Sequence, residues 1–125
     1  MPSIGCPVFV LQALAYARLA VDVYVHRIVQ TIGAMVATLG GIDALVFTAG
    51  VGERAAKIRK WVCEKLQYLG LELDSFANEN CHPDADIATA ASTARILVIA
   101  TREDLAIMRE TRRLVGLSTS RHHGV

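Results

Sequence analysis

The sequence predicts an α/β fold, because segments with helical periodicity alternate with short, continuous apolar runs. The segments follow in the order helix, strand, glycine turn, helix, strand, helix. The 125 residues suit one small domain, and 53% of them are hydrophobic, which excludes a disordered chain. A formal net charge of +1 argues against a nucleic-acid-binding protein, since it offers no basic surface for phosphates.

The longest helix is predicted over residues 11–39. Its apolar side chains recur at alternating spacings of four and three, as one face of a helix requires. This stripe consists of Val21, Val25, Ile28, Ile32, Met35 and Leu39. Other apolar residues widen it, so we expect the helix to be buried on more than one side. Two glycines at 40–41 end the helix, whereas prolines and a glycine predict an irregular leader over residues 1–10.

Two apolar runs without alternation, at residues 44–48 and 95–100, are typical of strands covered on both faces in a parallel sheet. Helical spacing returns over residues 55–69, and Gly70 ends that helix. The polar stretch 78–86 predicts a surface loop, because it is rich in turn-forming residues.

The last helix is predicted after the second strand, where Thr101 and Asp104 have the spacing of a capping box. It ends near Gly116. The predicted organisation is therefore the irregular leader, one domain over residues 11–116 and a polar tail over residues 117–125.

Cysteine usage and the start of the chain predict a cytoplasmic protein with reduced thiols. The three cysteines include no C-x-x-C pair, and no positively charged segment precedes the first apolar run. Charged residues and glycines interrupt the apolar stretches before the roughly 20 residues of a membrane span, so we predict no membrane segment.

The first candidate site is the glycine segment that follows the first strand. Proteins of the α/β class bind ligands at the carboxyl ends of their strands. Gly50 and Gly52 would let the backbone approach a ligand and adopt positive φ angles, and the next helix N-terminus would attract a phosphate. A tight turn whose glycines serve packing alone explains the same spacing, because the segment matches neither G-x-G-x-x-G nor the P-loop.

The second candidate site, Thr101-Arg102-Glu103-Asp104, also follows a strand and opens a helix. Two adjacent carboxylates can hold Mg²⁺, usually through water. Acidic residues in a first helical turn are also favoured by the helix dipole, by about 0.3–1 kcal/mol each, without any ligand. The residues alone leave both explanations open.

The glycine segment is part of a longer block, D-A-L-V-F-T-A-G-V-G-E at residues 43–53, and further blocks occupy residues 17–28, 69–78 and 98–111. Together they resemble the acetate kinases and their propionate kinase relatives, whose signature reads D-A-[LIV]-V-F-T-[GA]-G-[IV]-G-E. The other blocks are similar to the family's A-x-L-A-[LIV]-[DE]-[VI]-[FY]-x-x-R-[IV], L-G-[LIV]-x-[LIV]-D…N and V-I-P-T-N-E-E-[LE]-x-I-A-R-[DE]-T segments. They stand in family order at family spacing.

The resemblance implies the C-terminal portion of an ATPase domain with the actin and sugar-kinase fold, which is ribonuclease H-like. It implies a homodimeric phosphotransferase that converts ATP and acetate to ADP and acetyl phosphate, reversibly, with Mg²⁺. Carried onto this chain, ATP or ADP would be bound by Gly50, Val51, Gly52 and Arg54. Glu103 would be the carboxylate associated with the metal.

Two arginines depart from the family pattern. Arg54 and Arg102 each stand where the family has asparagine. Arginine donates hydrogen bonds but cannot accept them, and it is bulkier, so we expect altered or weakened nucleotide binding.

The resemblance falls only on the C-terminal part of a much longer family chain. Nothing here matches the family's catalytic and acyl-binding residues, so we assign no catalytic residue and expect the isolated chain to be inactive. The choice between acetate and propionate as acceptor stays open for the same reason. The alternative function is that of a non-catalytic remnant that retains nucleotide binding or dimerisation.

Overall fold

A computed structural model describes residues 7–119. Its elements are α1 (Pro7–Leu39), β1 (Ala44–Phe47), α2 (Ala49–Arg54), α3 (Ala56–Lys65), the 3₁₀ turn η1 (Gln67–Leu69), α4 (Ser75–Glu79), β2 (Ala85–Asp86), β3 (Arg95–Val98) and α5 (Glu103–Thr119). The predicted α/β class and the order of the predicted helices and strands are confirmed. The structure adds the short elements α2, α4 and β2.

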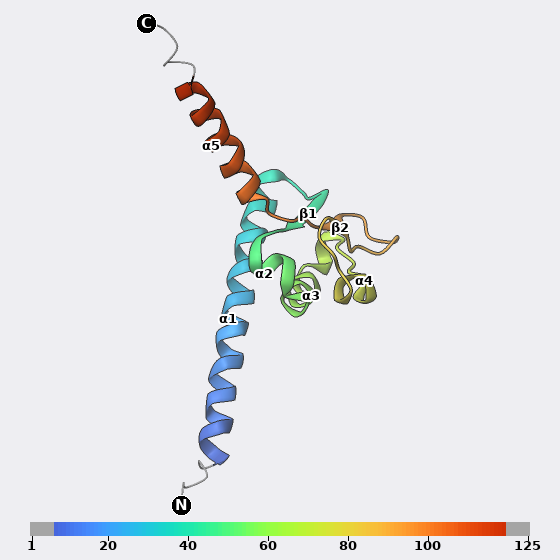
Figure 1. Cartoon of the computed structure of the whole chain (residues 1–125). Helices are drawn as coiled ribbons and strands as arrows, with labels where there is room; N and C mark the ends of the chain where they lie inside the picture. Colours follow the sequence, from blue (N-terminus) through green and yellow to red (C-terminus); the bar gives the residue numbers. More distant parts are fainter. Residues whose placement is uncertain (1–6, 120–125) are drawn as a thin grey trace, which may run out of the picture.

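The sheet has three strands in the order β1-β3-β2 (Figure 1). β1 and β3 are parallel, with Ala44 opposite Arg95 and Phe47 opposite Val98, while β2 is antiparallel to β3. The parallel pairing continues beyond the strands, because the amide of Ile99 donates to the Phe47 carbonyl at 2.9 Å. The chain therefore leaves β1 and β3 at the same edge of the sheet.

The hydrophobic core lies on one face of this sheet. Leu45 of β1 and Ile96 of β3 are buried there, and they pack with Val25 of α1 and Val62 of α3. On the other face, Val46 is 50% exposed. The prediction of strands covered on both faces is therefore wrong for this chain: the strands are continuously apolar in sequence, but their burial alternates.

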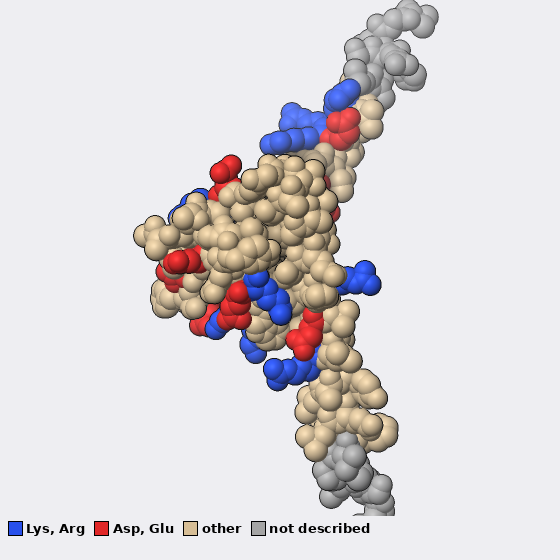
Figure 2. Space-filling model, turned by 180° about the vertical axis from the view of Figure 1, so that it is seen from behind, with Lys and Arg blue, Asp and Glu red and all other residues tan. Residues whose placement is uncertain are grey.

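Helix α1 is exposed along most of its length, contrary to the prediction that it is buried on more than one side. Val25 is its one fully buried residue among the described side chains. The partly buried side chains that pack beside it are Val21, Ile28, Val29 and Ile32. The first turns of α1 extend beyond the body of the protein and carry no charge (Figures 1 and 2), with Phe9 77% exposed.

Both ends of the chain contain more helix than predicted. α1 begins at Pro7, so residues 7–10 of the predicted leader are helical, and proline suits a first helical turn because its missing N–H would have no partner there. α5 continues past Gly116 to Thr119, so the predicted polar tail begins as helix. Residues 1–6 of the leader and 120–125 of the tail lie outside the described residues.

The segment Phe9–Leu39 is long and apolar enough to cross a membrane by length and composition alone. Arg18, Asp22 and Arg27 interrupt this segment in the sequence, but its average hydropathy stays high. In the structure the middle of this helix packs against the protein core through Val25.

The stretch 78–86, predicted as a surface loop, is partly ordered into secondary structure. It begins within α4, where Asn78 is only 2% exposed, and it ends in β2. Before this stretch, Leu73 forms an isolated antiparallel bridge with Ala88, which follows β2.

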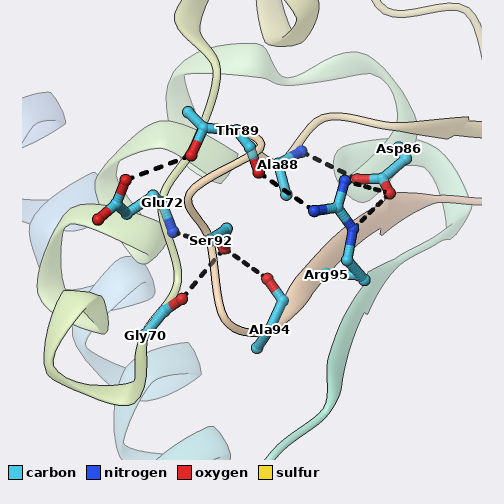
Figure 3. A network of polar contacts seen from close by, with 8 residues as sticks. All are labelled: Gly70, Glu72, Asp86, Ala88, Thr89, Ser92, Ala94 and Arg95. Carbon is cyan, nitrogen blue, oxygen red and sulfur yellow. Dashed lines mark hydrogen bonds and ion pairs between the residues drawn. The ribbon is translucent and has the colours of Figure 1, made fainter.

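A polar network ties the turn after η1 to the connection that enters β3 (Figure 3). The Gly70 carbonyl accepts a hydrogen bond from the Thr93 amide at 3.0 Å. The Ser92 hydroxyl accepts one from the Glu72 amide at 3.0 Å and lies within hydrogen-bond distance of the Gly70 and Ala94 carbonyls. Polar groups thus hold this turn in addition to Leu71, which is buried in the hydrophobic core.

A second part of the network joins β3 to β2. Arg95 donates from Nε to Oδ2 of Asp86 at 2.7 Å and from Nη1 to the Thr89 carbonyl at 3.1 Å (Figure 3). The short strand β2 is therefore held by the Arg95 side chain of β3 as well as by its backbone pairing with β3.

Gly70→Ala is predicted to lower the free energy of unfolding by about 1–3 kcal/mol. Gly70 has φ +81°, and a Cβ there would lie 1.7 Å from Oγ1 of Thr93, which would have to move. Urea denaturation followed by circular dichroism measures the effect. Gly33→Ala is the matched control, because Gly33 is helical and its Cβ would meet only Tyr68 Oη at 4.0 Å. Equal stability of Gly70→Ala and the wild type would contradict the prediction.

Candidate functional site

Two segments leave the shared edge of the sheet, residues 48–54 after β1 and 99–103 after β3. One carboxylate joins them. Oε1 of Glu53 accepts hydrogen bonds from the Thr101 amide at 2.8 Å and from the Thr101 hydroxyl at 2.7 Å. The structure therefore brings the two predicted sites together. Glu53 holds the segment 99–103 next to the segment 48–54 through Thr101.

Thr101 does not form the predicted capping box. α5 begins at Glu103, and the Thr101 hydroxyl donates to Glu53, with no described hydrogen bond between Thr101 and Asp104. Glu103 and Asp104 lie in the first turn of α5, where the helix dipole favours acidic side chains.

The same hydrogen bonds favour the ionised form of Glu53. The Thr101 hydroxyl, and after it the Thr101 amide, lower the pKa of Glu53, and Arg54 adds a smaller effect of the same sign. The carboxylate is therefore ionised at neutral pH. An ionised acceptor makes the stronger hydrogen bond, which suits its role as a link.

Gly50, Val51 and Gly52 lie in the helix α2 rather than in an open turn. The positive φ angle of this segment belongs to Ala49, at +61°, so the prediction that the glycines adopt positive φ is wrong. A Cβ on Gly52 would lie 3.2 Å from the Phe47 carbonyl carbon, so Gly52 serves close packing of α2 on the end of β1. Nothing lies within 4 Å of a Cβ built on Gly50, which leaves that stretch of backbone accessible.

The helix α2 is a weak element by itself. It has six residues, two of them glycine, and none of its residues is buried. A non-glycine residue at positive φ costs about 1–2 kcal/mol, and Ala49 carries that cost at the start of α2. The N-terminus of α2 therefore offers little of the helix dipole on which the predicted attraction of a phosphate rests, because few peptide dipoles add up in so short a helix.

A buried arginine holds the C-terminal end of α2. Arg59 is 2% exposed, and its Nη1 donates to the carbonyls of Gly52 at 2.8 Å and Glu53 at 2.9 Å. Its Nε and Nη2 donate to Oδ1 and the carbonyl of Asn78, both at 2.8 Å. Asn78 in turn donates from Nδ2 to the Ala56 carbonyl at 2.9 Å. Each described buried side-chain nitrogen and oxygen has a partner, so this network is complete.

Sequence reasoning missed Arg59 and placed Asn78 in a surface loop. The signal for Arg59 lies in its helix, because Arg59 shares a face of α3 with Val62, Cys63 and Leu66, all of them buried. A charged residue within an apolar stripe indicates a cation that is buried and bound by polar groups.

The other predicted site residues are exposed. Neither Arg54 nor Glu103 has a side-chain hydrogen bond to another described residue, so both are accessible to a ligand. Arg102 forms an ion pair with Asp84, which also accepts from the Ala100 amide at 3.0 Å. The hydrogen bond from Arg102, followed by that from Ala100, lowers the pKa of Asp84.

The carboxylates of Glu103 and Asp104 are of a type that Mg²⁺ accepts, but the described residues do not complete a metal site around them. Within residues 7–119, no group of three or more His, Cys, Asp and Glu side chains is close enough to hold a metal. Mg²⁺ commonly takes one or two carboxylates together with phosphates and water. Glu103 and the adjacent Asp104 are exposed carboxylates of that kind.

A groove of about 660 Å³ lies elsewhere, between α1 and α3. Its lining residues are Leu14, Ala17, Arg18, Val21, Asp22, Val25, Trp61, Glu64 and Lys65. None of them belongs to the segments 48–54 or 99–103, so the groove is separate from the candidate site.

The sequence profile described as the acetokinase family matches residues 11–109. Curated acetate kinases from Gloeobacter violaceus and Nostoc sp. are 56% identical over 96 residues and 57% identical over 94 residues. These matches cover 77% and 75% of this chain but 24% and 23% of the relatives. The chain thus spans about a quarter of the length of the curated relatives it matches.

Solved structures give the same result. The structure resembles Porphyromonas gingivalis acetate kinase with a TM-score of 0.72 at 33% identity, covering 85% of this chain and 27% of that one. It resembles a propionate kinase from Francisella tularensis with a TM-score of 0.66 at 38% identity, covering 81% and 26%. The resemblance found in the sequence and the predicted actin and sugar-kinase-like fold are confirmed.

Thr101→Val is predicted to raise the pKa of Glu53 toward that of an ordinary glutamate, because the hydroxyl donor is lost while the amide remains. The folded pKa is depressed, so the stability due to this link is complete above the unfolded pKa of about 4.3 and is lost as pH falls through the folded pKa. Thr101→Val should therefore destabilise the chain at pH 7, and the effect should shrink as pH falls through the folded pKa of Glu53. Carboxyl NMR titration and urea denaturation measure the two effects.

Thr111→Val is the control for this substitution, since Thr111 is exposed on α5. It should leave the Glu53 titration unchanged. A Glu53 pKa that does not move in Thr101→Val would show that the hydroxyl is not its main determinant.

Proposed function

We propose, because the chain belongs to the acetokinase family, that it carries the nucleotide-binding part of a kinase with a carboxylate acceptor. The reaction is ATP plus acetate to ADP plus acetyl phosphate. The observation that carries the proposal is the Glu53–Thr101 link. It joins the two segments that contain the family's motifs at the carboxyl edge of parallel strands, where α/β proteins bind ligands.

The first segment offers a surface for the nucleotide. Gly50 leaves backbone accessible, and Val51, 47% exposed, offers an apolar side chain to the adenosine. Gly52 keeps the segment against the end of β1. Arg54 adds an exposed cation beside them, which attracts phosphate but cannot accept a hydrogen bond from the nucleotide.

The second segment offers the metal carboxylate. Glu103 would hold Mg²⁺, directly or through water, while the phosphates of ATP or ADP supply further ligands. Bound magnesium neutralises charge on the phosphoryl group during its transfer. The link from Glu53 to Thr101 keeps Glu103 close to the nucleotide segment, since Thr101 precedes it by two positions.

The complete enzyme would be a cytoplasmic homodimer that phosphorylates acetate or propionate. The uncharged, exposed start of α1 supports association, because side chains such as Phe9 and Leu14 would leave water in a dimer. The residues that bind the acyl group and perform the transfer would lie in the remainder of the enzyme. The near-neutral charge of the chain supports a nucleotide rather than a nucleic acid as its partner.

Isothermal titration with ADP and Mg²⁺ tests the nucleotide site. The chain should bind ADP saturably, and Arg54→Asn should bind it several-fold more tightly, because asparagine restores an acceptor. Arg113→Asn is the charge-matched control, since Arg113 lies on α5 in an exposed pair with Glu110. Absence of ADP binding would contradict the site, and equal affinities of the wild type and Arg54→Asn would contradict the role of Arg54.

The isolated chain is predicted to have no acetate kinase turnover, because its segments bind nucleotide and metal without an acceptor site. Incubation with ATP, Mg²⁺, acetate and hydroxylamine should yield no acetyl hydroxamate above background. A complete acetate kinase serves as positive control. Hydroxamate formation by the purified chain would show that residues 1–125 contain the catalytic groups.

A further inference from the structure

We propose that Arg59 is a positioning residue for nucleotide binding: it orients α2 through the carbonyls of Gly52 and Glu53 without touching the nucleotide itself. This role rests on the proposed function, since α2 is the proposed nucleotide segment. The family motifs found in the sequence place no function on Arg59, which lies beyond the glycine block.

The first support is that buried side chains contribute nothing to the position of α2. Its six residues bury no side chain, so apolar packing does not fix it. It begins at a residue with positive φ and is separated from α3 by Ala55, whose φ and ψ of −98° and 77° are not helical. Glycines lower the stability of a helix further. The orientation of α2 therefore depends on its contacts with other segments.

The second support is the geometry of those contacts. Nη1 of Arg59 reaches the two consecutive carbonyls of Gly52 and Glu53 at 2.8 and 2.9 Å. These carbonyls lie near the C-terminal end of α2, where helix carbonyls lack amide partners. A cation placed there satisfies both groups, and because they are consecutive it fixes the direction of the backbone as well as its position.

The third support is that Arg59 is itself held from the far side. Asn78 accepts from Nε and Nη2 through its side chain and its carbonyl, and its own amide group donates to the Ala56 carbonyl. The side chain of Asp74 caps α4 by accepting from the Ala77 amide at 2.9 Å, which keeps Asn78 in place. The planar guanidinium, with donors on three nitrogens, spans these partners as a lysine ammonium cannot.

The test compares Arg59→Lys and Arg59→Met with Val62→Ala. Val62 is buried on the same helix and takes no part in the hydrogen bonds to α2, so its truncation serves as the control for lost stability. The readouts are ADP affinity by titration calorimetry, well below the unfolding temperature, and hydrogen exchange at the Ala55 amide. That amide donates to the Val51 carbonyl at 2.9 Å and so reports on the order of α2.

We expect both Arg59 variants to weaken ADP binding at least tenfold and to accelerate Ala55 exchange, with Met more affected than Lys. Val62→Ala should keep ADP affinity within twofold of the wild type. Wild-type affinity and exchange in Arg59→Lys would overturn the proposal, and so would an equal loss of affinity in Val62→Ala.

If the wild-type chain does not bind ADP, the proposed function fails. Hydrogen exchange still tests the role of Arg59, because the Ala55 amide should exchange faster in Arg59→Lys than in Val62→Ala if Arg59 orients α2. If the Arg59 variants do not fold, Asn78→Ala replaces them, because it removes the Oδ1 acceptor of Arg59 Nε and leaves the bonds to the Gly52, Glu53 and Asn78 carbonyls. It should weaken ADP binding at least threefold, and unchanged binding would overturn the proposal.

Discussion

The guanidinium of Arg59 places a positive charge inside the protein, and none of its hydrogen-bond partners is a carboxylate. A buried charge without partners would cost several kcal/mol, so the surrounding backbone has to supply them. It does so through the carbonyls of Gly52, Glu53 and Asn78, which lie near the C-terminal ends of α2 and α4, and through Oδ1 of Asn78. The segments 49–56 and 74–80 are therefore arranged around one cation, and their geometry depends on it.

This constraint explains how a poorly buried segment can form part of a site. Arg59 binds the C-terminal end of α2 from the protein interior. Glu53, the next-to-last residue of α2, binds Thr101 in the segment 99–103 that follows β3. The two contacts share Glu53, whose carbonyl faces Arg59 and whose carboxylate binds Thr101. A continuous set of hydrogen bonds thus runs from the protein interior through Glu53 to Thr101, two positions before the exposed Glu103, and the proposed nucleotide surface lies along it.

The sequence predicted the regular elements well and the site contacts poorly, for physical reasons. Periodicity and apolar runs find helices and strands because burial repeats along them, and β1, β3 and α3 follow that rule. α2 carries no such signal, since it buries nothing and is stabilised by residues distant in sequence. The prediction that β1 is buried on both faces is also wrong. An apolar run shows only that both faces of a strand could be buried, and the described residues cover one face of the sheet.

The motif blocks located the candidate residues but not their partners. Glu53 and Thr101 stood in separate blocks, and only the parallel register of β1 and β3 shows that they meet. The most direct test of the account is an amide NMR titration with ADP and Mg²⁺. Shift changes confined to residues 49–54 and 101–103 are predicted, while Trp61 in the groove between α1 and α3 stays unchanged. Changes centred on Trp61, with none at those two segments, would contradict the central claim that they form the nucleotide site.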